Sequence, residues 1–236
     1  MAFLRLDKYL SDMGIASRKE LKQLIRSGRV SVDGKSVLLP ETKIDCGSIV
    51  SVDGRILKYS KYHYYMMDKP CGILTATEDG RQKTVLDLVT DEMRRMGLFP
   101  VGRLDKDTSG VLLLTDDGEF AHRVISPKSS VEKLYYAKVD GIPDAEDVNA
   151  FEKGLILGDG THCLPAKLTL QGDNTCYVTV MEGKYHQVRR MLASRGKPVL
   201  ELRRMSIGRL KIDDALGPGG FRELEQWEID AVFLSN

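Results

Sequence analysis

The chain has 236 residues, of which 42% are hydrophobic and 29% are charged, and its formal net charge is +1. These values are typical of a globular protein with a substantial apolar core, and they exclude an intrinsically disordered chain. The overall charge does not indicate a polyanionic partner, so only a local excess of charge can do so. The length allows one large domain or two.

The sequence predicts a cytoplasmic protein without a membrane partner. No apolar run approaches the roughly 18–20 residues that a membrane helix needs, and the start of the chain is too polar for a signal peptide. The four cysteines are widely scattered and lack metal-ligand spacing. We interpret them as reduced thiols and expect no metal site.

Residues 1–60 are predicted to form a small domain. Hydrophobic periodicity and turn signals predict, in order, helices over residues 6–13 and 17–28 and strands over 30–34 and 49–54. Ser17 and Glu20 have the spacing of a capping box, which marks the start of the second helix. Each of the two strands ends in an Asp-Gly pair, the usual sequence of a tight hairpin turn.

The second predicted helix has a basic outer face. Arg18, Lys22 and Arg26 recur every four residues and therefore lie on one side of the helix. A solvated helix face is the simple interpretation, but a cluster of cations opposed only by Glu20 favours binding to a phosphate backbone. The candidate RNA-binding residues of this domain are Arg5, Arg18, Lys19, Lys22, Arg26 and Arg29.

A polar segment at 58–62 is the expected linker, and residues 61–236 are the expected second domain. Its predicted helices span residues 84–97, 116–126 and 183–196, and its predicted strands span 64–67, 99–101, 111–115, 134–139, 155–157, 166–170 and 176–181.

The strongest candidate for chemistry lies between two of these strands, in the loop that carries Arg103, Asp105 and Asp107. A charged loop on a rigid sheet is a common place for catalysis, although a solvated hairpin tip is the simpler interpretation. The spacing of oxygen side chains also resembles a calcium loop. An apolar strand begins inside that loop, however, and an EF-hand needs a helix there.

Residues 184–211 contain nine Lys or Arg and only Glu201 among the acids. A solvated basic helix is one interpretation, but in a near-neutral protein so local an excess favours an anionic ligand, most simply nucleic acid. The chain has no phosphate-binding glycine loop and no nucleophile elbow. A lone aspartate amid basic segments is suited to act as a base or a nucleophile at a sugar carbon.

Three segments resemble, in order, the motifs of the ribosomal pseudouridine synthases. They are Asp68-Lys-Pro-x-Gly72, Gly102-Arg-Leu-Asp105 with the strand that runs on to Thr115, and Glu182-Gly-Lys-Tyr-His-Gln-Val-Arg-Arg-Met191. Residues 1–60 resemble the S4 RNA-binding domain, which precedes the catalytic domain in the RsuA-type branch of that family. The resemblance covers nearly the whole chain.

The resemblance implies roles for individual residues. Asp105 would be the catalytic carboxylate that starts cleavage of the uridine glycosidic bond, either by attack on the anomeric carbon or by removal of the 2′ proton. Asp107 is its rival. Tyr135 would stack on the target base, with Tyr136 as the neighbouring alternative, and Arg189 would pair with the carboxylate. The further candidate substrate-binding residues are Arg103, Val180, Lys184, His186 and Arg190. No cofactor and no metal is implied.

The implied fold is α+β, with a small S4-like domain and a catalytic domain built on a mixed, largely antiparallel sheet. The implied function is isomerisation of a specific uridine to pseudouridine in 16S ribosomal RNA, because residues 221–229 resemble the small-subunit branch. Modification of 23S RNA is the first alternative, and a non-catalytic RNA-binding factor in ribosome assembly is the second. We expect a monomer that acts on ribosomal RNA, either free or within a partly assembled small subunit.

Overall fold

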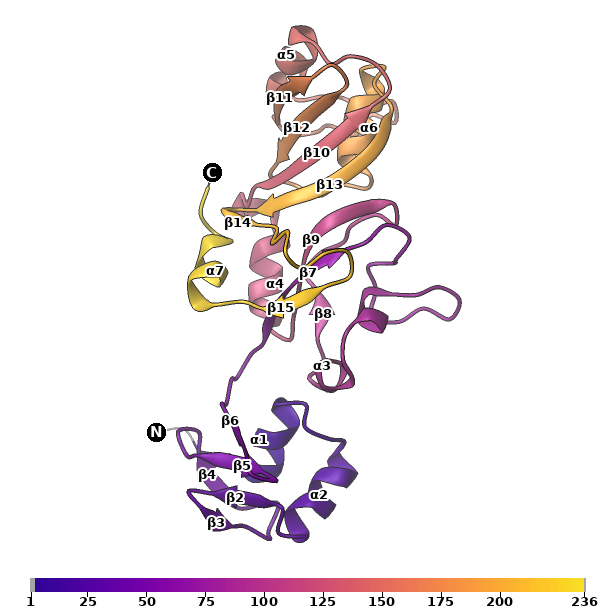
Figure 1. Cartoon of the computed structure of the whole chain (residues 1–236). Helices are drawn as coiled ribbons and strands as arrows, with labels where there is room; N and C mark the ends of the chain where they lie inside the picture. Colours follow the sequence, from indigo (N-terminus) through magenta and orange to yellow (C-terminus); the bar gives the residue numbers. More distant parts are fainter. Residues whose placement is uncertain (1–2, 236) are drawn as a thin grey trace. The chain divides into compact units, whose positions relative to one another are not determined.

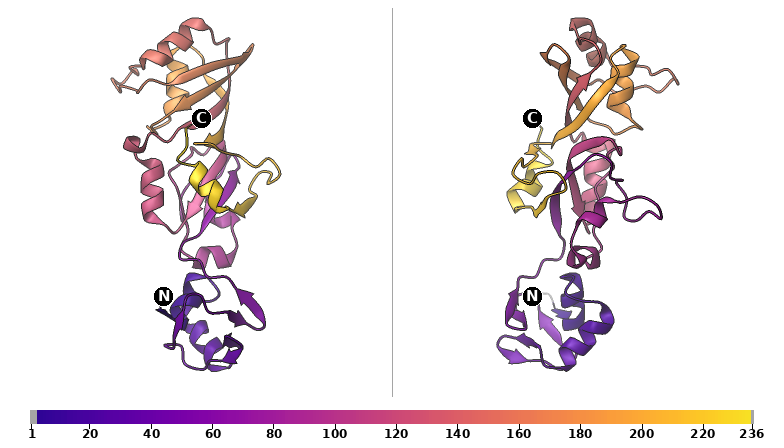
Figure 2. Two further views of the ribbon diagram at one scale, coloured as in Figure 1. Left: turned by 90° about the vertical axis from the view of Figure 1, so that its left-hand side faces the viewer. Right: turned by 45° about the vertical axis from the view of Figure 1, so that its right-hand side comes forward.

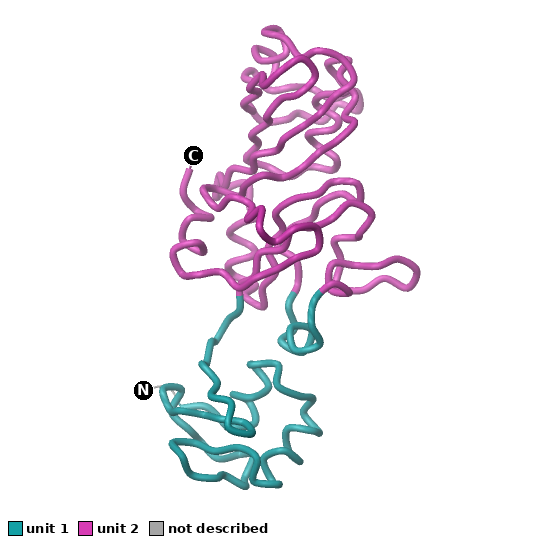
Figure 3. Tube along the Cα trace, viewed as in Figure 1, with its two compact units in different colours: residues 1–63, 89–98 teal, residues 64–88, 99–236 magenta. Residues whose placement is uncertain are grey.

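The structure is a computed structural model that describes residues 3–235 (Figure 1). The chain divides into two compact units (Figure 3). The first comprises the chain up to His63 together with Val89–Leu98, and the second comprises Tyr64–Leu88 together with the chain from Phe99 onward. Val89–Leu98 thus groups with the first unit, whereas the sequence places it in the second domain. The domain boundary after residue 60 stays a prediction.

The first unit is built from short helices and short antiparallel strands. Its elements are β1 (Phe3–Arg5), α1 (Leu6–Asp12), α2 (Arg18–Arg26), β2 (Val30–Val32), β3 (Lys35–Ser36), β4 (Lys43–Asp45), β5 (Val50–Val52), β6 (Arg55–Leu57) and α3 (Asp91–Arg95). Strands β3, β2, β5 and β6 form a sheet in that order, and β1 pairs with β4. The two helices and two strands predicted for residues 1–60 are confirmed.

Local sequence explains these elements. The Glu20 amide donates to the Ser17 hydroxyl at 3.4 Å and the Ser17 amide donates to the Glu20 carboxylate at 2.9 Å, which completes the predicted capping box at the start of α2. Asp33, Asp53 and the glycines that follow them all have positive φ, as type I′ hairpin turns require. Apolar side chains of α1, α2, β2 and β5 form the core of this unit.

The second unit contains most of the chain. Its elements are β7 (Tyr64–Lys69), η1 (Val85–Leu88), β8 (Phe99–Pro100), β9 (Thr108–Thr115), α4 (Gly118–Ile125), η2 (Pro127–Ser129), β10 (Lys133–Val139), α5 (Ala145–Lys153), β11 (Lys167–Gly172), β12 (Thr175–Val180), α6 (Gln187–Ser194), β13 (Val199–Ile207), β14 (Leu210–Lys211), β15 (Phe221–Glu223) and α7 (Gln226–Ala231).

A nine-stranded sheet organises this unit. The strand order is β11-β12-β10-β13-β9-β7-β15, with β14 attached to β13 and β8 attached to β9. Strands β13 and β9 pair in parallel and the other pairs are antiparallel, so the predicted mixed, largely antiparallel sheet is confirmed. Helices α5 and α6 pack on the β10 to β13 part of the sheet, and α4 packs beside β7 and β9 (Figures 1 and 2).

Two helices differ from their predictions. The helix expected over 84–97 is wrong, because the chain forms the 3-10 turn η1 and the separate helix α3. Thr90 between them is extended, and its hydroxyl accepts from the Met93 amide at 3.2 Å, so it caps a new helix. The helix expected over 183–196 starts only at Gln187, because His186 has a left-handed φ of 47°.

Two strand predictions also need correction. The strand expected over 155–157 is wrong, because this segment makes only a single bridge, from Ile156 to His162. The sequence predicts no strand over Val199–Ile207, where the structure has the long strand β13. Arg203 and Arg204 interrupt its apolar alternation, so the sequence gives no clear strand signal there.

Candidate active site

The loop that carries Asp105 joins β8 to β9, and hydrogen bonds from the segment after β7 hold it in place. The Thr75 hydroxyl donates to the Leu104 carbonyl at 2.7 Å and accepts from the Leu104 amide at 3.2 Å. The Gly72 amide donates to the Lys106 carbonyl at 2.8 Å. The backbone on both sides of Asp105 is therefore tied to a second stretch of chain.

A buried lysine lies beneath this loop. Lys69, the last residue of β7, is 0% exposed. Its ammonium donates to the carbonyl oxygens of Pro70, Asp105, Lys106 and Thr108 at 3.0, 3.2, 3.2 and 2.9 Å. Burial lowers the pKa of Lys69 to about 8, because a poorly solvated site disfavours the charged form. This side chain is the internal support of the Asp105 loop.

Two basic side chains lie beside the Asp105 carboxylate. His186 Nε2 is 3.4 Å from Oδ1, and Arg189 Nε is 3.9 Å from Oδ2. Arg189 also donates to the carbonyl oxygens of Asp107 at 2.9 Å and Val199 at 3.4 Å, which fixes its guanidinium next to the loop. The Asp105 side chain remains 29% exposed, so a ligand can reach it.

Asp105 lines a small pocket of about 60 Å³, called here the Asp105 pocket. Its apolar lining comes from Leu104, Val180 and Leu202, its aromatic lining from Tyr135, and its polar lining includes Arg103, Lys184 and His186. Arg103 is exposed, so its side chain can move when a planar base enters the pocket.

The segment 182–187 is held by a buried carboxylate. One oxygen of Glu182 accepts from the Leu164 amide at 2.9 Å and from the Gln187 side chain at 2.8 Å. The other oxygen pairs with Lys184 Nζ at 2.8 Å. The left-handed conformation of His186 then ends the segment, directly before α6. Glu182 thereby fixes the stretch of chain that brings His186 to Asp105.

Tyr135 and Tyr136, the two candidates for stacking on the target base, have different surroundings. Tyr135 lines the Asp105 pocket, whereas the Tyr136 ring packs edge-on against Tyr177, with ring centroids 5.8 Å apart. Neighbouring side chains of a strand point to opposite faces, which accounts for the difference. Arg190 does not line the pocket, because its guanidinium pairs with Asp159 at 2.6 Å.

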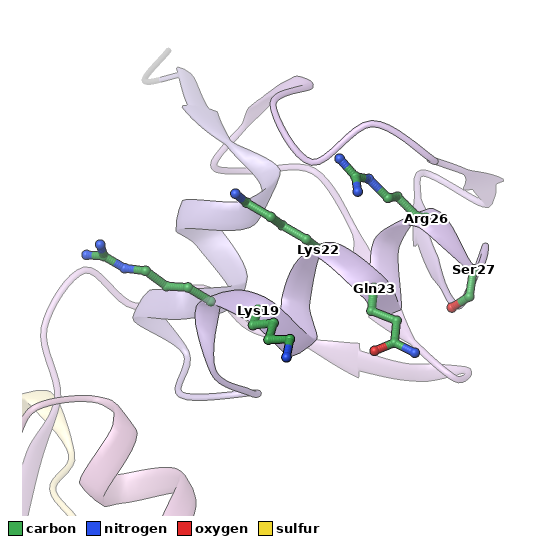
Figure 4. A pocket seen from close by; sticks show the side chains of 6 residues that line it. Lys19, Lys22, Gln23, Arg26 and Ser27 are labelled. Carbon is green, nitrogen blue, oxygen red and sulfur yellow. The ribbon is translucent and has the colours of Figure 1, made fainter.

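The predicted basic side chains of α2 lie together on its surface. Arg18, Lys19, Lys22 and Arg26, called here the basic face, line an open hollow with Gln23 and Ser27 (Figure 4). All four are exposed. The two other candidate cations have carboxylate partners: Arg5 pairs with Asp7 at 2.7 Å and Arg29 pairs with Asp53 at 2.5 Å.

Lys69, Thr75 and Glu182 are functional candidates that the sequence did not single out. Lys69 and Glu182 stand inside the quoted motifs, but burial of a charged side chain leaves no mark in the pattern. Within residues 3–235 no three metal-ligating side chains cluster. No helix in the same range has the length and apolar character needed to cross a membrane.

Comparison with known proteins gives matches over both units. Residues 63–194 match the family model of RNA pseudouridylate synthase, and residues 4–50 match that of the S4 domain. The crystal structure of a pseudouridylate synthase is similar, with a TM-score of 0.69 and 32% identity, covering 97% of this chain and 99% of that one.

Curated relatives are similar over nearly their whole length. An uncharacterized RNA pseudouridine synthase, YtzG of Bacillus subtilis, is 44% identical, covering 96% of this chain and 97% of the relative. Ribosomal small subunit pseudouridine synthase A of Vibrio cholerae is 39% identical, covering 98% and 100%. Ribosomal large subunit pseudouridine synthase B of Bacillus subtilis is 36% identical, covering 95% and 93%.

Proposed function

The chain belongs to the RNA pseudouridylate synthase family and is an RNA pseudouridine synthase, and we propose that it converts a uridine of 16S ribosomal RNA with Asp105 as its catalytic carboxylate. The observation that carries the proposal is this partly exposed carboxylate, which lines a pocket with Tyr135 and has His186 and Arg189 beside its two oxygens. Relatives named for the small ribosomal subunit favour 16S RNA. The relative named for the large subunit makes 23S RNA the alternative.

The chemistry required of Asp105 fits its surroundings. Separation of uracil from ribose builds positive charge on the sugar, and a carboxylate close by stabilises that charge. Asp105 acts either as a nucleophile at the anomeric carbon or as a base toward the 2′ proton, after which the uracil turns and rejoins through carbon. Arg189 and His186 hold the carboxylate in orientation. The isomerisation keeps every atom of the uridine, so we assign it no cofactor.

The target base has to leave its stack to reach Asp105. Flipping costs a few kcal/mol, and stacking on an aromatic ring at roughly 1–3 kcal/mol offsets much of that. Tyr135 is the aromatic side chain of the pocket, and Val180 supplies an apolar wall. Arg103 and Lys184 are placed to contact the sugar and phosphates as the pocket opens.

The S4 domain supplies sequence-independent affinity in this proposal. The basic face presents four exposed cations to RNA phosphates, and such contacts position a protein on its target. Arg5 and Arg29 add to this surface, although each also bonds a carboxylate. The proposed enzyme is a monomer whose substrate is ribosomal RNA, free or in a partly assembled small subunit, which would place it in the cytoplasm.

Pseudouridine mapping of 16S and 23S RNA after incubation with purified protein tests the proposal. We expect one new pseudouridine in 16S RNA with the wild type and none with Asp105→Ala. Asp107→Ala is the matched control, because it removes the rival carboxylate two residues away on the same loop, and it should retain the mark.

Other outcomes separate the alternatives. A mark in 23S RNA would move the enzyme to the large-subunit branch. A mark that persists in Asp105→Ala and disappears in Asp107→Ala would transfer the catalytic role to Asp107. Absence of any mark in naked RNA and in subunits, with RNA still bound, would favour the non-catalytic assembly factor.

A further inference from the structure

We propose that a second pocket next to Asp105 binds the nucleotide that adjoins the target uridine in the RNA strand, with its phosphate held by Lys133 and Arg204. This inference rests on the proposed function, because it assigns a subsite to the same substrate. The second pocket, called here the adjoining pocket, has a volume of about 500 Å³. It shares four lining residues with the Asp105 pocket: Arg103, Tyr135, Glu182 and Gly183.

Two buried cations line the adjoining pocket. Lys133 is 8% exposed and Arg204 is 4% exposed. Lys133 Nζ donates to the Val124 carbonyl at 3.1 Å, and Arg204 Nε donates to the Val111 carbonyl at 2.8 Å. Arg204 Nη2 has no hydrogen-bond partner among residues 3–235, and in that range neither cation forms an ion pair with a carboxylate.

Among the described residues, Glu182 is the one carboxylate that lines the adjoining pocket, and it already has other partners. Glu182 accepts hydrogen bonds from the Leu164 amide and the Gln187 side chain and pairs with Lys184, and none of these partners is Lys133 or Arg204. Burial and the neighbouring charge of Arg204 together lower the pKa of Lys133 to about 8. Two buried like charges without a counter-charge are unfavourable, and an anionic ligand would offset that cost.

The sheet places the two cations where an RNA strand leaves the active site. Tyr135 of β10 pairs in register with Arg204 of β13, and Lys133 lies two residues before Tyr135 on the same face of β10. Tyr135 and Arg103 border both pockets. A strand whose flipped uridine occupies the Asp105 pocket therefore passes directly into the adjoining pocket.

The remaining lining distinguishes a nucleotide from a bare phosphate. Pro100, Val101, Ile125 and Ile207 give the adjoining pocket an apolar side, which suits the face of a base. Its volume also exceeds what a phosphate alone would fill. Lys and Arg side chains are strong phosphate ligands, so the pair of charges and the apolar side together match one nucleotide.

The test uses the full-length protein and the RNA fragment that carries the mapped uridine, or the fragment found by footprinting if no uridine is modified. We expect Lys133→Met to weaken binding about tenfold and to reduce the slope of log affinity against log salt by about 0.7, as loss of one phosphate contact on a single strand should. Lys138→Met is the matched control, because Lys138 is exposed on the same strand β10 and does not line the pocket.

The RNA supplies the second arm. The phosphates beside the target uridine are replaced, one at a time, by neutral methylphosphonates. We expect the replacement at one position to weaken binding of the wild-type protein. The same replacement should not weaken binding of Lys133→Met any further. Ile125→Trp should weaken binding by narrowing the apolar side. Its control, Ile142→Trp, changes an exposed isoleucine outside the pocket.

Three results would overturn the inference. The first is RNA binding that neither Lys133→Met nor Ile125→Trp weakens, and the second is an additive effect of Lys133→Met with every methylphosphonate. The third is free uridine monophosphate that binds as tightly as the RNA, with Lys133→Met abolishing only the binding of this small molecule. The last would indicate a small-molecule site. If pseudouridine forms but no methylphosphonate effect depends on Lys133, this inference alone is refuted. If one methylphosphonate effect depends on Lys133 but no pseudouridine forms, the catalytic proposal is refuted and the RNA-binding pocket is retained.

Discussion

Single buried charges in this protein have two different explanations. Lys69 is fully buried, but four carbonyl oxygens surround its ammonium, so it stabilises the Asp105 loop from within. Lys133 is almost as buried, and among residues 3–235 its ammonium has only the Val124 carbonyl as an acceptor. The first lysine belongs to the scaffold, whereas the second is explained by the nucleotide that we propose for the adjoining pocket.

We expect Lys133→Met to raise the free energy of unfolding at pH 7 by up to about 3 kcal/mol, because the folded pKa is about 8 instead of 10.5 and each unit corresponds to about 1.36 kcal/mol. Between pH 8 and 10.5 the unfolded lysine keeps its proton and the folded one loses it, so wild-type stability rises with pH relative to the mutant. The difference should therefore be largest below pH 8 and should fade toward pH 10.5.

Urea unfolding at several pH values from 7 to 10.5 measures this difference. Lys69, whose pKa burial lowers to about 8, titrates in the same range but cancels between wild type and mutant. Lys138→Met, at an exposed position of the same strand, is the control variant. A gain in stability that stays constant with pH would contradict burial of the Lys133 charge.

At the scale of elements, the parallel pairing of β9 with β13 depends on a glycine. Gly110 has a φ of 105°, and a Cβ there would lie 2.1 Å from the Arg204 carbonyl oxygen. The three nearest atoms, the carbonyl oxygen, the amide nitrogen and the carbonyl carbon of Arg204, are all backbone within the sheet and cannot move aside. We expect Gly110→Ala to lower the free energy of unfolding by about 3 kcal/mol or more.

Chemical denaturation measures this effect, with Gly118→Ala as the control. Gly118 opens α4, has no positive φ, and an added Cβ would meet nothing within 4 Å. Alanine should leave stability there unchanged or slightly raised, because it favours helix. Equal stability of the two variants would show that the sheet tolerates a side chain at the pairing.

The segment before α6 is a second element whose geometry serves the site. We expect Glu182→Gln to lower kcat about tenfold, because one carboxylate holds Leu164, Lys184 and Gln187 and thereby places His186 beside Asp105. Single-turnover kinetics at saturating RNA isolates this effect from binding. Asp159→Asn breaks the ion pair with Arg190 outside the pocket and should leave kcat unchanged. A rise in KM with normal kcat would assign Glu182 to binding.

Elements with a strong local signal could be predicted from the sequence. The capping box gave the start of α2, and the apolar run before Thr115 gave β9. The family resemblance implied roles for Asp105, Tyr135 and Arg189; Asp105 and Tyr135 line one pocket, and Arg189 lies beside the Asp105 carboxylate.

Features fixed by distant contacts could not be predicted. Arg203 pairs with Asp68 and Arg204 bonds the Val111 carbonyl, so β13 is stabilised by strands far away in sequence that no local pattern records. The left-handed His186 and the buried Lys133 are similar cases. Their conformation and burial follow from tertiary packing, which overrides local propensity.

At the scale of the whole molecule, the basic face lies in the first unit and Asp105 lies in the second. Affinity for RNA and the chemical step should therefore respond to different substitutions. The phosphate contacts proposed for the basic face would contribute to binding equally before and during the reaction, so their loss should raise KM and leave kcat unchanged.

We expect Lys22→Gln combined with Arg26→Gln to weaken RNA binding and to reduce the salt slope by about 2, since each lost duplex phosphate contact contributes about 0.9. Pseudouridine formation at saturating RNA should keep its wild-type rate. Lys35→Gln with Lys43→Gln removes the same charge from exposed positions elsewhere in the first unit and is the matched control. Equal weakening by both pairs would mean that only total charge matters, and a reduced kcat would mean that the basic face also positions the target uridine.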